Sequence, residues 1–172
     1  LFMQVAVENN VAGNNFGPDP TPTNDFIPCA TVTITPGGFP KTIVIDFGTA
    51  LNFDIVSKGR EFLGGLILPG LDTSAYALNK RTAYLPKVDI KKPNKIIGKD
   101  TNSAISSGIY NGTVGAVLYI LKEIERELRG VQSIIATGGD AKKFIEDIPP
   151  VTMYIPHLTL EGIKIAFEES LD

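Results

Sequence analysis

The stretch Ile43-Val44-Ile45-Asp46-Phe47-Gly48-Thr49-Ala50 is the most informative part of this 172-residue chain. Its apolar half is rich in β-branched residues, which favours a buried strand, and a second strand-like stretch, 51–57, follows at once. Glycine lets backbone N–H groups approach an anion, and Thr49 adds a hydroxyl donor. Asp46 would repel a phosphate unless a cation lay between them. The pattern predicts a phosphate-and-cation loop, with an ordinary hairpin turn as the alternative.

The composition is that of a globular chain with a single domain-sized core. Hydrophobic residues make up 43% and charged residues 20% of the sequence. The net charge is −3 and no basic cluster stands out beyond Lys91-Lys92, which argues against a nucleic-acid partner. A lone cysteine, Cys29, excludes an internal disulfide and fits a reducing cytoplasm. With one histidine as well, a conventional zinc site cannot be assembled within one chain.

Membrane association is not expected from the sequence. No uninterrupted apolar stretch reaches the roughly 18 residues that a membrane span needs. The first seven residues lack the charged-then-apolar layout of a signal peptide. These features predict a soluble, cytoplasmic protein.

The chain divides into an Asn- and Pro-rich segment, 1–41, which receives no assignment, and a regular region, 42–172. Within the first segment, 1–28 is predicted to be irregular, and 30–35 to be a strand that could form a hairpin with 42–47. The regular region predicts strands and helices in the order 42–47, 51–57, 61–68 (strands), 71–83, 101–129 (helices), 133–137 (strand), 141–145 (short helix), 152–155 (strand) and 158–171 (helix). A further β-like patch covers 88–90. The order βββαα-βα-βα predicts an α/β domain with a mixed sheet.

Two predicted helices carry distinctive faces. Asp100 or Thr101 can cap the start of helix 101–129, and its small residues lie four apart: Ala104, Gly108, Gly112 and Ala116. Because glycine costs a helix up to about 1 kcal/mol relative to alanine, something should approach this stripe closely. Tight packing inside the domain is the simplest interpretation, and a second subunit or a ligand are the alternatives. The last helix carries apolar residues on one face: Leu160, Ile163, Phe167 and Leu171.

Seven short motifs follow one another between residues 42 and 169. They are Asp46-Phe47-Gly48-Thr49-Ala50, Gly64-Gly65-Leu66-Ile67-Leu68-Pro69-Gly70, Ala83-Tyr84-Leu85-Pro86, Ile97-Gly98-Lys99-Asp100-Thr101, Ser107-Gly108 with Gly112, Ala136-Thr137-Gly138-Gly139, and Leu158-Thr159-Leu160-Glu161-Gly162. Each is weak alone, but their order resembles the C-terminal lobe of the type III pantothenate kinases. The resemblance implies a single ribonuclease-H-like lobe with a mixed sheet, of the actin-like ATPase superfamily, over 42–172.

The same resemblance implies a function and a nucleotide site. Family members transfer the γ-phosphate of ATP to pantothenate in the first step of coenzyme A biosynthesis. Asp46 matches the carboxylate that holds a monovalent cation, K⁺ or NH₄⁺, beside the phosphates. Gly48 and Thr49 match the loop that contacts ATP, and Mg²⁺ accompanies the nucleotide. Gly138 and Gly139 match the turn around the nucleotide, although they could equally be a simple turn.

The resemblance also implies a substrate contact and a partner. Thr101 matches the residue that touches pantothenate, and a helix N-terminus suits the carboxylate of that substrate. Thr101 could equally be only a helix cap. Family members are dimers, and the small-residue stripe is compatible with a homodimer. Lone His157 is interpreted as a surface or cap residue rather than a catalytic base.

Two departures from the family pattern bear on activity. Leu51 and Asn52 stand where the family usually has two threonines. The N-terminal lobe, with its Asp-x-Gly-Asn-Thr loop and the Gly-Ala-Asp-Arg segment that carries the general base, is not recognisable. No catalytic residue is therefore identified, and the chain could be an incomplete or inactive copy of the enzyme. The alternatives are a non-catalytic nucleotide-binding or dimerising module, or a regulatory accessory factor.

Overall fold

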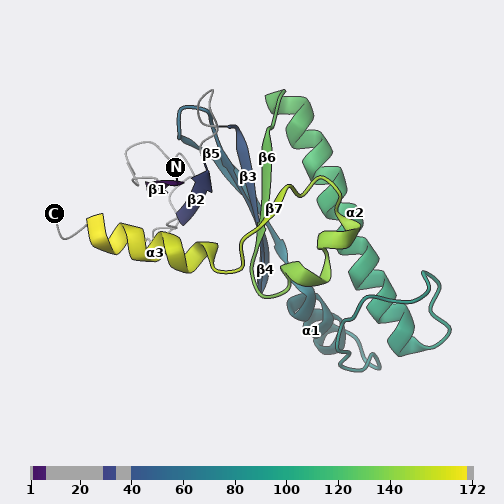
Figure 1. Cartoon of the computed structure of the whole chain (residues 1–172). Helices are drawn as coiled ribbons and strands as arrows, with labels where there is room; N and C mark the ends of the chain where they lie inside the picture. The colour runs from purple at the N-terminus through teal and green to yellow at the C-terminus, as the bar shows by residue number, and fades with distance from the viewer. Residues whose placement is uncertain (1, 7–28, 34–39, 170–172) are drawn as a thin grey trace, which may run out of the picture.

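A five-stranded mixed sheet forms the centre of the computed structural model, which describes residues 2–6, 29–33 and 40–169 (Figure 1). Its strands lie in the order β5-β4-β3-β6-β7. Their bounds are β3 Thr42–Phe47, β4 Ala50–Val56, β5 Phe62–Pro69, β6 Ser133–Thr137 and β7 Met153–Tyr154. The first three pair antiparallel, whereas β6 runs parallel to β3 and β7 parallel to β6. This arrangement is that of a ribonuclease-H-like lobe, which confirms the predicted fold class.

Burial along the strands follows from their place in the sheet. In the central strand β3, all four residues from Thr42 to Ile45 are buried, as expected of a strand covered on both faces. Its neighbour β4 alternates between buried and intermediate positions. Leu51, Phe53 and Ile55 face the core, while Asn52 and Asp54 occupy the opposite face of the sheet.

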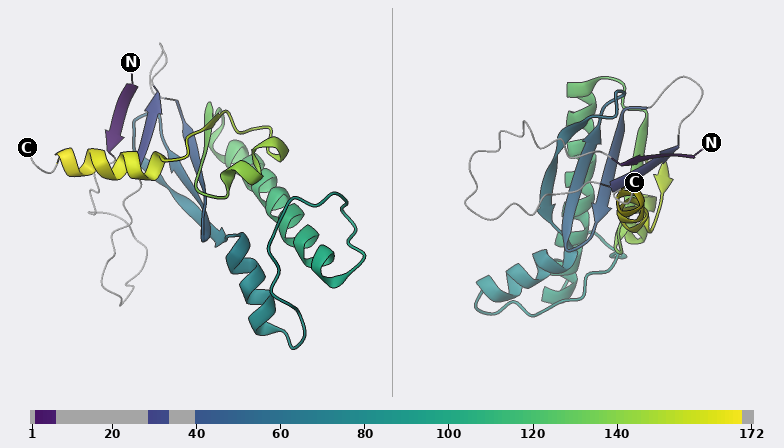
Figure 2. Two further views of the ribbon diagram at one scale, coloured as in Figure 1. Left: turned by 60° about the horizontal axis from the view of Figure 1, so that its bottom comes forward. Right: turned by 90° about the vertical axis from the view of Figure 1, so that its left-hand side faces the viewer.

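One long helix, α2 (Thr101–Leu128), covers one face of the sheet (Figures 1 and 2). It buries Ile105, Tyr110, Val117, Leu121 and Ile124 in a core shared with β3 and β4. A shorter helix, α1 (Leu71–Arg81), continues from the end of β5 and contacts α2. Both helices lie within one or two residues of their predicted bounds.

By length and composition alone, α2 could cross a membrane, and among the described residues it is the one helix that could. This is weak evidence, because the core helix of a water-soluble protein passes the same test. Six of its residues are buried.

Two short 3₁₀ helices replace the single helix predicted over 141–145. They are η1 (Ala141–Lys143) and η2 (Ile145–Asp147), with Phe144 between them. The Phe144 ring stacks on Phe47 at a centroid distance of 5.1 Å and on Tyr110 at 5.0 Å. This aromatic stack joins the end of β3, the 3₁₀ segment and α2, so packing rather than helical periodicity organises the segment.

The N-terminal predictions need correction. Strands β1 (Phe2–Ala6) and β2 (Cys29–Thr33) pair antiparallel in a separate two-stranded sheet. The predicted hairpin between 30–35 and 42–47 is wrong, because β3 is already paired on both edges, with β4 and β6. The prediction that 1–28 is irregular is wrong for β1, and 7–28 lie outside the described residues. No strand forms over 88–90, where Ile90 is buried within a loop.

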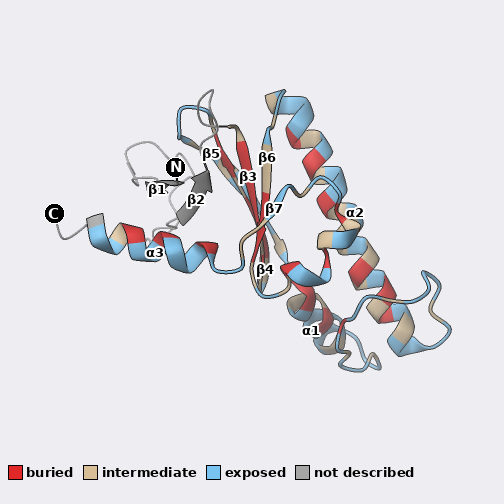
Figure 3. Cartoon of the chain, in the orientation of Figure 1, coloured by how far each residue is buried: buried red, intermediate tan, exposed pale blue. Residues whose placement is uncertain are grey.

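The last helix, α3 (Leu158–Glu169), extends away from the five-stranded sheet and packs against β1 and β2 (Figures 1 and 2). Its buried residues include Leu158 and Ile165. The apolar face identified in the sequence lies on the exposed side, because Leu160, Ile163 and Phe167 are all exposed (Figure 3). Leu171 lies outside the described residues.

The small-residue stripe of α2 also faces outward. A Cβ atom added to Gly108 or Gly112 would meet no atom within 4 Å among the described residues. Ala104 is exposed and Ala116 half-buried. Tight packing inside the domain, the simplest interpretation of the sequence, is therefore wrong for Gly108 and Gly112, whereas Gly98 does pack closely on the backbone of Ala104.

Candidate functional site

The two segments predicted to bind nucleotide meet at one edge of the sheet. Parallel pairing places Asp46, near the end of β3, opposite Thr137, the last residue of β6. Because the carboxyl ends of parallel strands reach the same edge, the turn after β3 and the Gly138-Gly139 turn after β6 lie side by side. The sequence predicted both segments, and the parallel register brings them together.

Gly138 is held against Asp46 by the main chain. Its φ angle is +92°, and an added Cβ would lie 2.5 Å from the Phe47 carbonyl oxygen and closer still to Oδ1 of Asp46. The backbone N–H of Asp140 donates to the same Phe47 carbonyl at 3.0 Å, which fixes the two turns together. Only glycine fits at position 138. At Gly139, in contrast, an added Cβ would meet nothing within 4 Å, so this side of the turn is open.

The turn that carries Gly48 and Thr49 is braced by the start of α1. The Thr49 carbonyl accepts hydrogen bonds from the Gly70 N–H at 3.0 Å and from the Thr73 hydroxyl at 2.7 Å. Gly48 N–H donates to the Ala50 carbonyl at 3.0 Å, which closes the turn. The Thr49 side chain is exposed. The loop therefore combines a fixed backbone with an accessible hydroxyl.

The carboxylate of Asp46 is half-buried, and burial raises its pKa. The hydroxyl of Thr159, from α3, donates a hydrogen bond to Oδ2 of Asp46 at 3.4 Å. This hydrogen bond lowers the pKa of Asp46 and so partly offsets the effect of burial. On the next strand, burial raises the pKa of Asp54 to about 6, and the nearby charge of Asp46 adds to the effect. Both carboxylates therefore lie where negative charge is poorly solvated.

Asn52 lies between these two carboxylates. It is directly opposite Asp46 in the antiparallel register, two residues before Asp54 on the same face of β4. Its side-chain oxygen is buried and has no hydrogen-bond partner among the described residues. A buried acceptor without a donor, beside two half-buried carboxylates, fits a cation with oxygen ligands. The described residues hold no group of three His, Cys, Asp or Glu side chains that could bind a metal ion.

Thr101 lies at the other predicted site, the start of α2, but it is not the cap. Oδ1 of Asp100 accepts a hydrogen bond from the Ser103 N–H at 3.0 Å, and the Ser103 hydroxyl accepts one from the Asp100 N–H at 3.2 Å. This is a capping box, and its hydrogen bonds lower the pKa of Asp100. The alternative that Thr101 is only a helix cap is therefore wrong. The Asp100 carboxylate already occupies the helix N-terminus that was expected to receive a substrate carboxylate.

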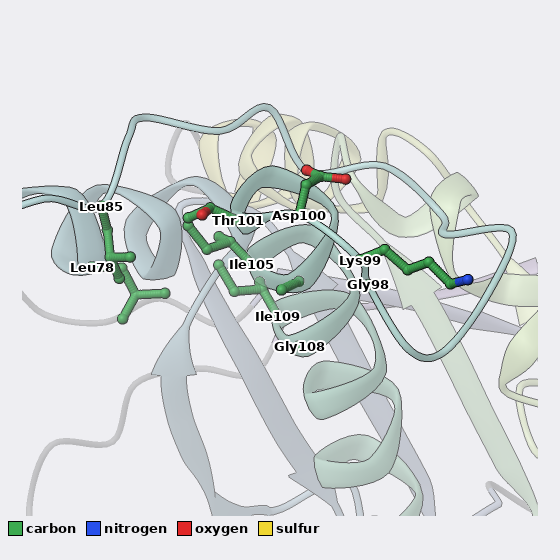
Figure 4. Close-up of a pocket in the computed structure, with 10 residues that line it drawn as sticks. Leu78, Leu85, Gly98, Lys99, Asp100, Thr101, Ile105, Gly108 and Ile109 are labelled. Carbon is green, nitrogen blue, oxygen red and sulfur yellow. The ribbon is translucent and has the colours of Figure 1, made fainter.

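Thr101 lines a cavity of about 750 Å³ between α1 and the start of α2 (Figure 4). The cavity is lined by Leu78, Leu85, Gly98, Lys99, Asp100, Thr101, Ala104, Ile105, Gly108 and Ile109. The Lys99 side chain extends away from the apolar cluster formed by the leucines and isoleucines (Figure 4). An apolar wall with a few polar groups beside it is the usual lining of a site for a small organic molecule.

The two predicted sites are not brought into one pocket. The nucleotide turn contacts Thr73 in the first turn of α1, whereas the cavity is lined by Leu78 further along the same helix. These two residues are separated by about 7.5 Å of helix at 1.5 Å per residue. Asp46 does not line the cavity. Within one copy of the lobe, the site around Asp46 and the cavity at Thr101 are neighbours rather than parts of one cleft.

Sequence reasoning missed two members of the site. Thr159, which contacts Asp46, lies within the Leu158–Gly162 motif, but the motif by itself indicates no role for its hydroxyl. Asn52 was noted only as a departure from a threonine pair. The alternation of β4 could have placed Asn52 and Asp54 on one face, but only the register shows that this face also carries Asp46.

Comparison with known proteins identifies the family. The sequence model of the type III pantothenate kinase family matches residues 29–123. A type III pantothenate kinase from Sulfurihydrogenibium sp. (strain YO3AOP1) is 46% identical over 124 residues, covering 72% of this chain and 49% of the relative. The corresponding protein from Koribacter versatilis (strain Ellin345) is 43% identical over 134 residues, covering 74% and 47%. The chain spans about half the length of the curated relatives it matches.

Solved structures share the fold. A conserved putative Baf family transcriptional activator from Campylobacter jejuni aligns with a TM-score of 0.52 at 24% identity, over 76% of this chain and 59% of that protein. An Alp12 filament structure aligns with a TM-score of 0.54 at 15% identity, over 79% and 50%. These likenesses show that the lobe shares its fold with both proteins. The family match and the relatives above 40% identity show that the chain belongs to the type III pantothenate kinase family.

Proposed function

We propose that this chain forms the ATP-binding lobe of a cytoplasmic pantothenate kinase, which transfers the γ-phosphate of ATP to pantothenate in the first step of coenzyme A biosynthesis. The observation that carries the proposal is the junction of the two turns, where Gly138 is pressed against Asp46. A turn with no Cβ beside a half-buried carboxylate leaves main-chain groups accessible to a phosphate chain. Membership of the family supplies the reaction class.

In this proposal the phosphates lie against Gly48 and Thr49, and the nucleoside lies along Gly138 and Gly139. A monovalent cation, K⁺ or NH₄⁺, lies on Asp46 and offsets its repulsion of the phosphates. The orphaned oxygen of Asn52 supports a cation at this place, because it is a further acceptor with no donor. Mg²⁺ enters with the nucleotide and would neutralise charge on the transferred phosphoryl group.

Pantothenate occupies the cavity that Thr101 lines. The apolar wall of Leu78, Ile105 and Ile109 suits an aliphatic body, and the Thr101 hydroxyl can hydrogen-bond to a polar end. The capped helix start makes the Thr101 hydroxyl, rather than the helix dipole, the main attraction at this end of the cavity. Gly112 of α2, which faces outward and does not line the cavity, supports a homodimer, because it lets a second helix approach closely.

Calorimetry of ADP and Mg²⁺ binding, in K⁺ and in Na⁺, tests the nucleotide site. Asp46→Asn should abolish the advantage of K⁺ over Na⁺, because the neutral amide loses the charge that holds the cation. Thr101→Ala should leave nucleotide affinity nearly unchanged. Asp72→Asn, an exposed carboxylate in the first turn of α1, is the matched control and should behave like the wild type. Equal effects of Asp46→Asn and Asp72→Asn would refute the cation role.

A non-catalytic binding module, or a regulatory accessory factor, is the second candidate. It is favoured by the separation of Asp46 from the Thr101 cavity and by the absence of a recognisable general base in the sequence. Pantothenate-dependent release of ADP separates the two candidates. We expect little turnover from the 172-residue chain alone, and robust turnover would show that its own residues complete the catalytic site.

A further inference from the structure

A buried aromatic residue, Phe144, joins the nucleotide turn to α2. It lies between η1 and η2 and is 1% exposed. Its ring stacks on that of Phe47 with an angle of 23° between the ring planes, and on that of Tyr110 with an angle of 17°. Phe47 and Tyr110 are themselves only 3% and 2% exposed. The three rings are therefore packed together out of reach of solvent and of any ligand.

Phe47 begins the nucleotide turn, whose far end is braced at Thr49 by the start of α1. It follows Asp46 and precedes Gly48, and its carbonyl oxygen accepts the Asp140 N–H at 3.0 Å. Because Gly48 has no Cβ, the backbone here has wide conformational freedom that no side chain of its own restricts. A contact that fixes the Phe47 ring therefore also fixes the backbone on either side of it.

The segment that carries Phe144 is anchored at its far end by α2 and by the loop before α2. The Tyr110 hydroxyl donates to the Lys143 carbonyl oxygen at 2.7 Å and to Oδ2 of Asp147. The Lys92 ammonium lies 2.8 Å from the same Asp147 oxygen. Lys92 and Tyr110 lower the pKa of Asp147, which keeps this carboxylate ionised as an acceptor. Two 3₁₀ helices of three residues each hold little shape of their own, so these contacts fix the position of the Phe144 ring.

We propose that Phe144 is a positioning residue for the nucleotide turn. It holds Phe47 and, through Phe47, keeps the backbone of Asp46 and Gly48 in the conformation that receives the phosphates. Because it is buried, Phe144 touches neither the nucleotide nor the cation. The proposal rests on the nucleotide site proposed above and adds to it a residue that acts from behind the turn.

Calorimetry of ADP binding with Mg²⁺, in K⁺, tests this role. Phe144→Leu removes both ring stacks and should weaken ADP binding at least about five-fold, because the binding conformation of the turn is then populated only part of the time. Leu121→Ala is the matched control. It deletes the same number of side-chain carbon atoms from the same core, about 16.5 Å further along α2 than Tyr110. It should bind ADP like the wild type, although it too lowers the stability of the fold.

Two substitutions at Tyr110 separate the stacked ring from the hydroxyl. Tyr110→Phe keeps the ring, so it should bind ADP nearly as well as the wild type even though it loses a hydrogen bond. Tyr110→Leu removes the ring and should weaken ADP binding as Phe144→Leu does. Equal ADP affinities of the two Tyr110 variants would overturn the role of the stack.

Amide hydrogen exchange, followed by NMR without nucleotide, tests the same role independently of binding. The N–H groups of Gly48 and Asp140 form the hydrogen bonds that close the nucleotide turn and join it to the turn after β6, so their exchange reports local opening. Phe144→Leu should speed this exchange at least about five-fold relative to Leu121→Ala. Phe144→Met, which leaves less empty space than leucine but has no ring, takes its place if Phe144→Leu does not fold.

The outcomes separate this proposal from the nucleotide site on which it rests. If the wild-type chain binds ADP, unchanged exchange or unchanged ADP affinity in the Phe144 variant would overturn this proposal alone. A wild-type chain that binds no ADP would instead overturn the nucleotide site, and the positioning role with it.

Discussion

Replacing Gly138 with alanine should be far more damaging than the same change at its neighbour Gly139. Gly138 has a φ of +92°, which a residue with a Cβ adopts only at a cost of roughly 1–2 kcal/mol. The added methyl would also lie 2.5 Å from the Phe47 carbonyl oxygen. That oxygen already accepts the Asp140 N–H, so it cannot move without disturbing the turn. Overpacking of this kind costs typically about 1–3 kcal/mol.

Together these terms predict a loss of about 2–5 kcal/mol for Gly138→Ala, a large part of the roughly 5–15 kcal/mol that stabilises a typical domain. Urea unfolding followed by circular dichroism measures it. At a typical dependence of about 2 kcal/mol per molar urea, the midpoint should fall by roughly 1–2.5 M. Gly139→Ala is the matched control, because its methyl meets nothing within 4 Å and its midpoint should barely change.

The same pair of variants also tests the proposed nucleotide site. Gly138→Ala pushes against Asp46, so any variant protein that remains folded should lose ADP affinity as well as stability. Equal unfolding midpoints for the two alanine variants would refute the argument that main-chain approach requires glycine at position 138. A stable Gly138→Ala protein with normal ADP binding would contradict the proposed role of the junction.

Three further predictions concern stability. Lys41→Met removes the hydrogen bonds that the ammonium group donates to the carbonyls of Leu128 and Arg129 at the end of α2. The free energy of unfolding, measured in urea, should fall by about 1–3 kcal/mol. An unchanged unfolding midpoint would refute this prediction. The folded-state pKa of Asp54, raised to about 6, means that the folded protein binds the proton more tightly than the unfolded chain, so stability should fall by about 2–3 kcal/mol as pH rises from about 4 to 6. Asp54→Asn should remove most of this dependence of stability on pH. An unchanged dependence would show that a group other than Asp54 causes it. Tyr110→Phe should cost about 1–2 kcal/mol in thermal unfolding, because its hydroxyl hydrogen-bonds to Asp147; no loss would show that this bond contributes nothing.

Local pattern was sufficient for most elements of the regular region. The β-branched run before Asp46 predicted β3, and β6 was predicted with the bounds that the structure has. The helical spacing after Asp100 predicted α2 to within one residue. These elements were predictable because hydrophobic periodicity and capping act over a few residues. The segment 141–147 was less predictable from local pattern, because the stacking of Phe144 on Phe47 and Tyr110 decides its conformation.

Pairing and orientation depended on contacts distant in sequence. The strand near Cys29 looked like a hairpin partner for β3, but both edges of β3 are taken by β4 and β6. The apolar face of α3 and the glycines of α2 were readable as stripes, yet periodicity does not say whether a stripe is covered. The seven motifs supported the family because their order is a property of the sequence, and the comparisons confirm it.

The sequence by itself determined the family, the ribonuclease-H-like succession of strands and helices, and the two glycine-containing turns as candidate contacts. The family and its fold follow from the resemblance carried by the order of the motifs, and the turns follow from local spacing along the chain. Only the tertiary structure decided that Gly138 is pressed against Asp46, that Asn52 and Asp54 share its face, and that the Thr101 cavity lies apart from both turns. The physical reason is that register and packing join residues some 90 positions apart, and no local pattern encodes which strand edge or helix face will be free to receive them.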